Sequence, residues 1–157
     1  MKALILILAI AMTGAGCYLA AIRRHTEIER PITSQELVGR WVLTTNSLKS
    51  VMVDGFTPNK GEEVVITLRS NNSYSFHTMS PRWDGSKRVV ERVDSEGQWS
   101  VTYAATNVFR NELVLRSSQE AVSFLYVALD SQTMILWTSW GDPDEGVDLV
   151  YQKVREE

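Results

Sequence analysis

The 157-residue chain contains a single cysteine, Cys17, and only two histidines. One cysteine cannot build a disulfide framework or a cysteine-based metal site. The formal net charge is only −3, and the lysines and arginines are scattered along the sequence. Nucleic-acid binding requires a basic stripe, which is missing here. The sequence therefore predicts no nucleic-acid partner and no metal ion bound through cysteine.

Catalytic motifs are also missing. The chain has no G-x-S-x-G, phosphate-binding loop, H-E-x-x-H or dinucleotide fingerprint. His77, the only histidine in the predicted domain, has no second histidine or cysteine with which to share a metal ion. Residues 141–148 are rich in carboxylates, but their spacing does not fit an EF-hand. We predict that the protein is not an enzyme and has neither a metal site nor a cofactor.

The first 22 residues have the order of a secretory signal. Lys2 gives a positive start, residues 3–12 are apolar, and small residues precede Cys17. Small residues before a cysteine resemble the lipobox of bacterial lipoproteins, which implies lipidation of Cys17. Residues 3–22 also carry no charge, and twenty helical residues would span about 30 Å, the thickness of a bilayer core. A signal peptide with lipidated Cys17 and a transmembrane anchor are the two alternatives.

Either anchor holds the protein at a membrane, and we expect it on the outer side of a bacterial cytoplasmic membrane, in the cell envelope. Residues 23–32 are predicted to form a short charged linker in which His25 is solvated. Pro31 disfavours helix at Arg30 and ends whatever precedes it. The remaining residues, 33–157, have room for one domain.

The body of the chain alternates apolar and polar residues in short stretches joined by polar turns. Thr33 and Glu36 form a capping box, which predicts one or two helical turns before Gly39. About nine strands follow, with no helical pattern between them. The strands are expected at residues 40–47, 62–68, 73–79, 87–94, 97–105, 111–116, 121–130, 133–140 and 147–154. The pattern indicates an all-β fold, an antiparallel up-and-down β-barrel of about 8–9 strands preceded by a short helical turn and an N-terminal hydrophobic helix.

A short helical turn, the sequence Gly39-Arg40-Trp41 at the start of the first strand, and a strand meander resemble the lipocalin-like members of the calycin superfamily. The resemblance implies that Trp41 packs across the closed end of the barrel. It also implies a basic residue over the indole ring, for which Lys153 and Arg155 are the candidates. Gly39 would permit the tight bend between helix and strand.

The resemblance covers residues 33–155 and implies a barrel that binds a small apolar ligand or a protein partner at its open end. The aromatic residues predicted to line its interior are Tyr74, Phe76, Trp99, Tyr103, Phe124 and Tyr126. Residues 47–61 would form a lid over the open end. Trp83, in a connection between strands, is a candidate plug or partner contact. The alternative is a structural or inhibitory envelope protein that acts through its loops and holds no internal ligand.

Overall fold

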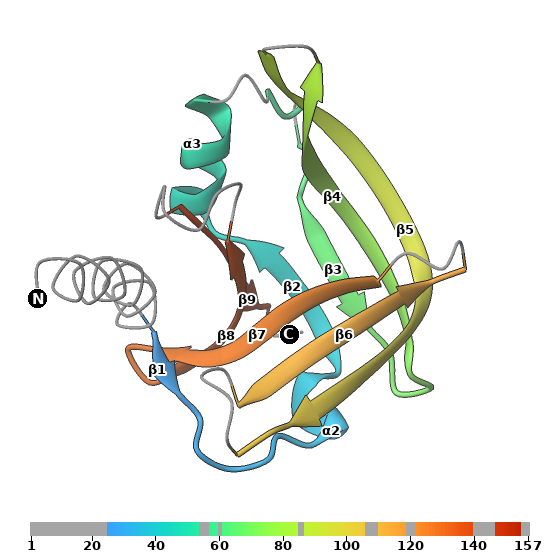
Figure 1. The fold of residues 1–157 in the computed structure, drawn as a ribbon, viewed down its shortest axis with the longest axis vertical. Helices are drawn as coiled ribbons and strands as arrows, with labels where there is room; N and C mark the ends of the chain where they lie inside the picture. The colour runs from blue at the N-terminus through green and yellow to red at the C-terminus, as the bar shows by residue number, and fades with distance from the viewer. Residues whose placement is uncertain are drawn as a thin grey trace, which may run out of the picture.

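The computed structural model describes residues 25–53, 57–59, 61–84, 87–105, 110–118, 122–139 and 147–154, with the backbone alone at 53, 79–84 and 87–90. Its main feature is an antiparallel sheet of nine strands, eight of which close into a barrel (Figure 1). The barrel strands neighbour one another in the order of the chain, and the last pairs with the first. The predicted all-β, up-and-down antiparallel barrel is confirmed.

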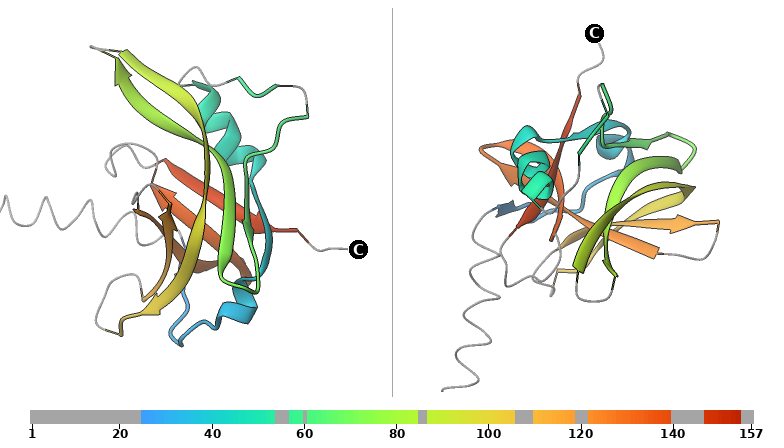
Figure 2. Two further views of the ribbon diagram at one scale, coloured as in Figure 1. Left: turned by 90° about the vertical axis from the view of Figure 1, so that its right-hand side faces the viewer. Right: turned by 90° about the horizontal axis from the view of Figure 1, so that it is seen from above.

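The barrel strands are β2 (Gly39–Leu43), β3 (Val65–Leu68), β4 (Ser73–Asp84), β5 (Lys87–Tyr103), β6 (Asn111–Ser117), β7 (Val122–Asp130), β8 (Thr133–Ser139) and β9 (Asp148–Lys153). The additional strand β1 (Thr26–Glu27) pairs with β7 at Ala128 and Leu129, just beyond the part of β7 that pairs with β6. The described part also has two short helices, α2 (Ser34–Leu37) and α3 (Thr45–Val53). Figures 1 and 2 show these helices at opposite ends of the barrel.

The long strand β5 differs from the sequence-based prediction of two strands separated by a turn at residues 94–97. The structure instead has one strand of 17 residues. Gly97 lies where β5 pairs with both neighbours, opposite Tyr74 of β4 and Ser117 of β6. A Cβ atom at Gly97 would lie 2.0 Å from the carbonyl oxygen of Arg116. The glycine therefore permits a close approach of two backbones and does not form a turn.

Helix α3 is the second difference, because the first strand was predicted to extend to Ser47. The strand ends at Leu43, and the Ser47 backbone N–H donates a hydrogen bond of 3.3 Å to Oγ1 of Thr44, which thereby caps α3. Val51 of α3 is fully buried and Leu48 packs against the same core. Part of the predicted lid is thus a helix packed on one end of the barrel.

The barrel interior is filled by side chains from all eight barrel strands. They form one continuous cluster that also includes Leu37 of α2 and Val51 of α3, so it reaches both ends of the barrel. The largest fully buried strand residues in this cluster are Trp41, Tyr151, Ile66, Leu68, Leu113, Leu115, Leu125 and Leu136. The described interior residues therefore form one hydrophobic core that runs along the barrel axis.

Trp41 closes the barrel at the α2 end. Its Nε1–H donates a hydrogen bond of 2.8 Å to the Leu37 carbonyl, and the Nζ of Lys153 lies 5.7 Å from the centre of its ring. The same Nζ donates a hydrogen bond of 2.9 Å to the Glu36 carbonyl. Gly39 has a φ of +138°, and a Cβ there would lie 2.6 Å from Cε of Lys153. Lys153 is thus the basic partner of Trp41, and the other candidate, Arg155, lies outside the described residues.

Residues 25–33, called here the N-terminal strap, belong to the barrel. A solvated linker was predicted for most of this stretch, but Ile28 and Ile32 are buried in the core. The side chain of Asn111, which is 1% exposed, binds the strap at three points. Its amide donates hydrogen bonds to the carbonyls of Ile28 and Arg30, and its oxygen accepts one from the Ile32 N–H, at 2.8, 3.0 and 3.0 Å.

Among the described residues, no helix has the length and apolar character needed to cross a membrane. The predicted signal or anchor at residues 1–22 and the candidate lipidation site Cys17 lie outside the described residues.

Replacing Asn111 with alanine should lower the free energy of unfolding by about 3 kcal/mol, because three buried backbone groups lose their partner. Chemical denaturation would measure this loss, and hydrogen exchange should become faster at the Ile32 amide. Asn46→Ala is the matched control, since that amide makes no hydrogen bond to another described residue. An equal loss in both variants would contradict the role given to Asn111.

Replacing Trp41 with alanine should cost about 3–5 kcal/mol, as truncation of a buried aromatic side chain does. Lys153→Met keeps the apolar stem but removes the ammonium group, and should cost about 1–2 kcal/mol. Thermal and chemical denaturation would measure both. A negligible loss for Trp41→Ala would mean that the indole does not hold this end of the barrel together.

Candidate binding recess on the outer wall

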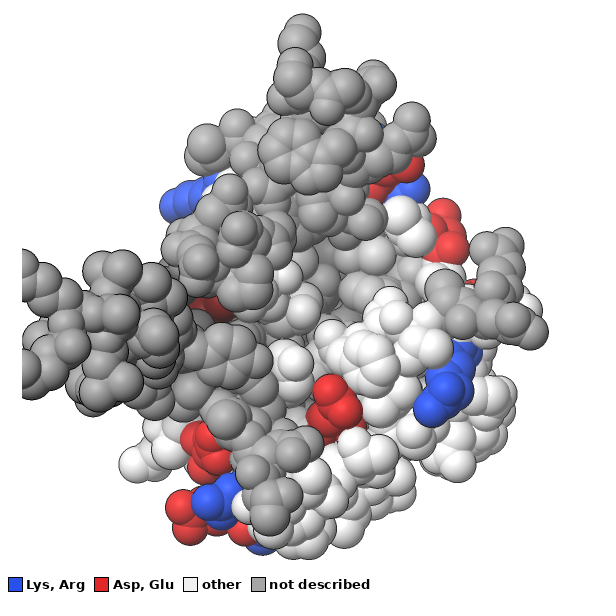
Figure 3. Space-filling model, viewed as in Figure 1, with Lys and Arg blue, Asp and Glu red and all other residues white. Residues whose placement is uncertain are grey.

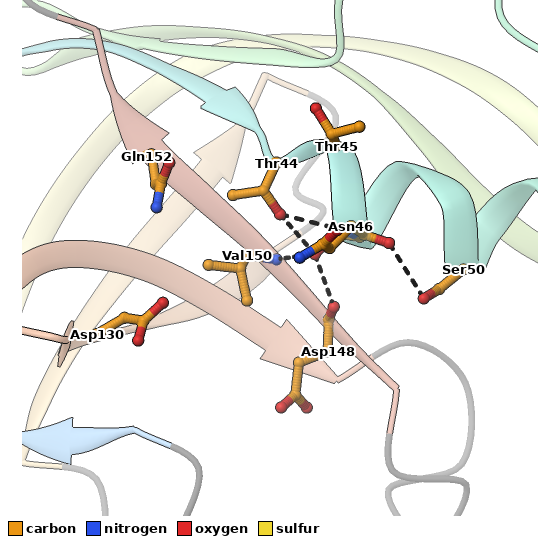
Figure 4. A pocket seen from close by; sticks show the side chains of 9 residues that line it. Thr44, Thr45, Asn46, Ser50, Asp130, Asp148, Val150 and Gln152 are labelled. Carbon is orange, nitrogen blue, oxygen red and sulfur yellow. Dashed lines mark hydrogen bonds between the residues drawn. The ribbon is translucent and has the colours of Figure 1, made fainter.

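A polar recess lies on the outer side of the barrel, where the start of α3 meets β9 (Figure 4). Its volume is about 390 Å³. Eight of its nine lining residues are polar, and two of these are acidic; none is lysine, arginine or histidine. The lining residues are Thr44, Thr45, Asn46, Ser47, Ser50, Asp130, Asp148, Val150 and Gln152.

The alternation of β9 places part of this recess on the outer wall. Leu149 and Tyr151 point into the core, so Val150 and Gln152 face outward. Ser47 of α3 then joins the helix to the strand. Its hydroxyl donates to the Asp148 carbonyl at 3.0 Å and accepts from the Val150 N–H at 2.9 Å. Because Ser47 is only 5% exposed, these hydrogen bonds are shielded from solvent and hold α3 against β9.

Several polar groups in the recess have no hydrogen-bonding partner within the described part of the chain. The side chains of Thr45, Asn46 and Gln152 make no hydrogen bond to another described residue. Asp130 accepts one from the neighbouring Ser131 hydroxyl at 3.3 Å. By contrast, the hydroxyl of Ser50 is already bonded to the Asn46 carbonyl at 3.2 Å. The recess therefore offers two amides, a hydroxyl and a carboxylate to a ligand.

Asp148 connects this recess to the N-terminal strap. Its carboxylate lies 3.5 Å from Nε2 of His25, and the two side chains are 9% and 11% exposed. The His25 ring also packs against Trp137 of β8, with ring centres 5.2 Å apart. Figure 4 shows the Asp148 carboxylate turned away from Asn46 and α3. His25, predicted to be a solvated linker residue, is thus packed on the barrel wall.

Three of the six aromatic residues predicted for the barrel interior pack in it. Tyr74 and Trp99 are buried in the core, and Phe76 packs partly buried against it. Tyr103 lies at the end of β5 and is 36% exposed, with its hydroxyl bonded to the Glu29 carbonyl of the strap at 2.9 Å.

The two aromatic residues of β7 are on the other side of the wall. Leu125 and Val127 of β7 point into the core, whereas Phe124 is 48% exposed and Tyr126 packs on the outside. The predicted interior placement of Phe124 and Tyr126 is therefore wrong. Residues 121–130 are almost continuously apolar, and such a run gives no alternation from which to choose the inner face.

His77 belongs to a second polar group, on the outer side of β4 and β5. Its Nδ1 lies 2.5 Å from a carboxylate oxygen of Asp94, and its Nε2 lies 3.3 Å from Oε1 of Glu62. Arg92 bonds both carboxylate oxygens of Glu62 and the Thr57 carbonyl. This group ties the connection after α3 to the barrel wall.

The charges in this group change the proton affinities of its members. The hydrogen bond to Asp94 raises the pKa of His77 above its usual value, with Glu62 adding to the effect and burial opposing it. The hydrogen bonds from Arg92 lower the pKa of Glu62 to about 2. Folding therefore favours the imidazolium form of His77 and the carboxylate form of Glu62.

The stability that protonated His77 contributes should be fully present below its unfolded pKa of about 6.5 and be lost as the pH rises through its raised folded pKa. Wild type should therefore exceed His77→Gln in stability by more at about pH 5.5 than at about pH 9. Asp94→Asn should flatten that difference, because Asp94 is the main cause of the shift. Urea denaturation across this range would measure it, and a difference that grows with pH would contradict the assignment.

Comparisons with protein-family models, with curated proteins and with solved structures found no significant match for this chain.

Two other predicted features lie outside the described part of the chain. The side chain of Trp83 and residues 141–146 of the acidic run lie outside the described part, although the backbone of Trp83 is in the β4–β5 hairpin opposite Arg88.

Proposed function

We propose that the protein is a membrane-tethered, lipocalin-like barrel of the bacterial cell envelope that binds a small polar ligand in the recess between α3 and β9. It acts by binding, without catalysis. The observation that carries the proposal is the contrast between the two candidate sites. The barrel interior is one packed cluster, whereas the recess of about 390 Å³ contains polar groups without partners among the described residues.

The packed interior weakens the case for an internal apolar ligand. Such a ligand would have to displace large buried side chains such as Trp41 and Tyr151. Removing a side chain of this kind from its packed position costs several kcal/mol, which binding would have to offset. The same packing also suits the alternative, a structural or inhibitory envelope protein without an internal ligand. The two functions differ in whether the recess has an occupant.

The lining of the recess determines the class of ligand. Hydroxyl and amide groups from Thr45, Asn46 and Gln152 can exchange hydrogen bonds with ligand hydroxyls, and the carboxylate of Asp130 can accept one from an ammonium group. No basic residue is present in the lining to pair with an anion. The volume is within the range of about 300–1,000 Å³ that is usual for small-molecule sites. We infer a small polyhydroxylated ligand with an amino group.

Glucosamine is a simple probe of this chemistry, and its binding to the full chain in detergent micelles can be followed by calorimetry. Asp130→Asn should weaken binding about tenfold, because a charge-assisted hydrogen bond is worth about 1.5–3 kcal/mol. Glu112→Gln, on the outer side of β6, is the matched control and should leave the affinity unchanged. Sorbitol, which lacks the amino group, should bind more weakly to wild type.

Failure of wild type to bind glucosamine would contradict the inferred ligand class. Native mass spectrometry of the detergent-extracted chain distinguishes the functions further. A co-purified apolar molecule that survives Asp130→Asn would instead support an internal ligand.

A further inference from the structure

The distance between the apolar N-terminal run and the barrel is very short. The uncharged run ends at Ile22. Three residues further on, His25 already packs against Trp137 and lies next to Asp148. Three extended residues span at most about 10–11 Å. The headgroup layer on one side of a bilayer is about 5–8 Å thick. A chain whose apolar run is held in a membrane therefore has almost no slack, and the barrel wall beside His25 must lie at the membrane surface.

The position of His25 limits which part of the wall this is. Its ring packs on the outer side of β8, where Trp137 is also in contact with Tyr126 of β7 at a ring-centre distance of 5.2 Å. On one side of this point, towards β9, lies the polar recess with its acidic residues. On the other side lie the outer faces of β7 and β6. These two surfaces differ strongly in polarity.

The outer face of β6 and β7 carries apolar side chains between Glu112, which lies opposite Tyr126, and Arg116; of these apolar residues, Val114 is itself only 4% exposed. Phe124 lies directly opposite Val114, and the neighbouring residue on the same face, Val122, is opposite Arg116. Phe124 is 48% and Val122 39% exposed, which makes them two of the most exposed large apolar residues in the described part. Figure 3 looks onto this face and shows a mostly uncharged surface with a few acidic and basic side chains, some of them in contact at its edge. Val114, Val122, Phe124 and Tyr126 are called here the β6–β7 apolar face.

We propose that the β6–β7 apolar face rests in the headgroup layer of the membrane that holds the N-terminal run. This inference rests on the proposed function with residues 3–22 as the membrane-spanning tether, and not on the ligand of the recess. The tether would bring this face close to the membrane, since the strap contacts the barrel wall beside Tyr126. The face supplies the chemistry, because aromatic and aliphatic side chains near a basic residue such as Arg116 suit the boundary between acyl chains and anionic headgroups.

The occupant is a lipid surface because the tether already delivers the face to one. Contact with a protein would require the partner to enter the narrow space between barrel and bilayer. Burial of Phe124 and Val122 against lipid would also account for two apolar side chains left in water by a barrel whose other large apolar residues are mostly internal.

A fluorescent probe placed on the face can test this. The full chain is reconstituted into vesicles of phosphatidylethanolamine and phosphatidylglycerol, with an environment-sensitive NBD label on Phe124→Cys or, as a second variant, Val122→Cys. Thr67→Cys is the matched control, because Thr67 lies outward on β3, on the far side of the ring from β7. The unsubstituted chain gives the background from Cys17, and circular dichroism shows that each variant is folded.

Labels on the β6–β7 apolar face should show blue-shifted emission and at least twofold stronger quenching by lipids with a doxyl group near the headgroup than the label at position 67. Equal quenching at all three positions, in protein that sediments with the vesicles, would overturn the membrane contact while leaving the tether intact. A blue shift without lipid quenching would show that the label is buried against protein, either this chain or a second copy of it, and would also overturn the membrane contact. Failure to sediment with the vesicles would overturn the tether, and with it this inference.

Discussion

The antiparallel pairing of β2 with β9 is the constraint on which the rest of the structure depends. The two strands are the first and last of the barrel, so their pairing turns an open sheet into a ring and leaves no exposed edge there. Trp41 pairs with Lys153 in this register, which places the ammonium group over the indole. Leu43 pairs with Tyr151, so both point into the core. A shift of one residue would turn Tyr151 to solvent and remove the charge from Trp41.

The same register determines where a ligand can bind. With Tyr151 inside, its neighbours Val150 and Gln152 face outward, and in this register Ser47 bonds the β9 backbone at Val150. One face of β9 thus contributes to the core, and its opposite face contributes to the recess. A barrel filled by its own side chains is rigid, and a rigid wall holds α3 and β9 at a fixed spacing.

How far the fold could be predicted depended on the local pattern of each segment. Residues 62–68 and 73–79 alternate clearly, and the inner faces predicted from Ile66 and Tyr74 are the observed ones. Where the signal was missing, as in the continuously apolar stretch of β7, the face of Phe124 could not be chosen. The break predicted near Gly97 had a different cause, because a glycine that allows close backbone approach looks the same in sequence as one in a turn.

The site was harder to predict than the fold because its parts come from distant segments. The Thr-Thr-Asn-Ser run that begins α3 contains a helix cap, and this signal could have been found in the sequence. Nothing local, however, indicates that Ser47 bonds to Val150, or that Asn111 binds a strap about 80 residues earlier. Such contacts exist only once the ring has closed, and a polar residue that is buried in this way looks like any surface residue in the sequence.

The N-terminal strap connects several of these distant segments. It is hydrogen-bonded to β6 through Asn111 and to β7 through β1, and it contacts β9 where His25 lies 3.5 Å from Asp148. Asp148 also lines the recess, so the segment that leads to the apolar N-terminus is in contact with the wall of the candidate site. Only two residues, Arg23 and Arg24, separate the apolar run from His25, so a barrel tethered through that run as proposed would have little freedom to turn above its membrane. In the proposed membrane-tethered state, the strap would orient the barrel and bring the recess, which contains Asp148, towards the bilayer surface. A ligand of this recess would therefore be met at the membrane, where an envelope component with hydroxyl and amino groups is a more natural occupant than a freely diffusing solute.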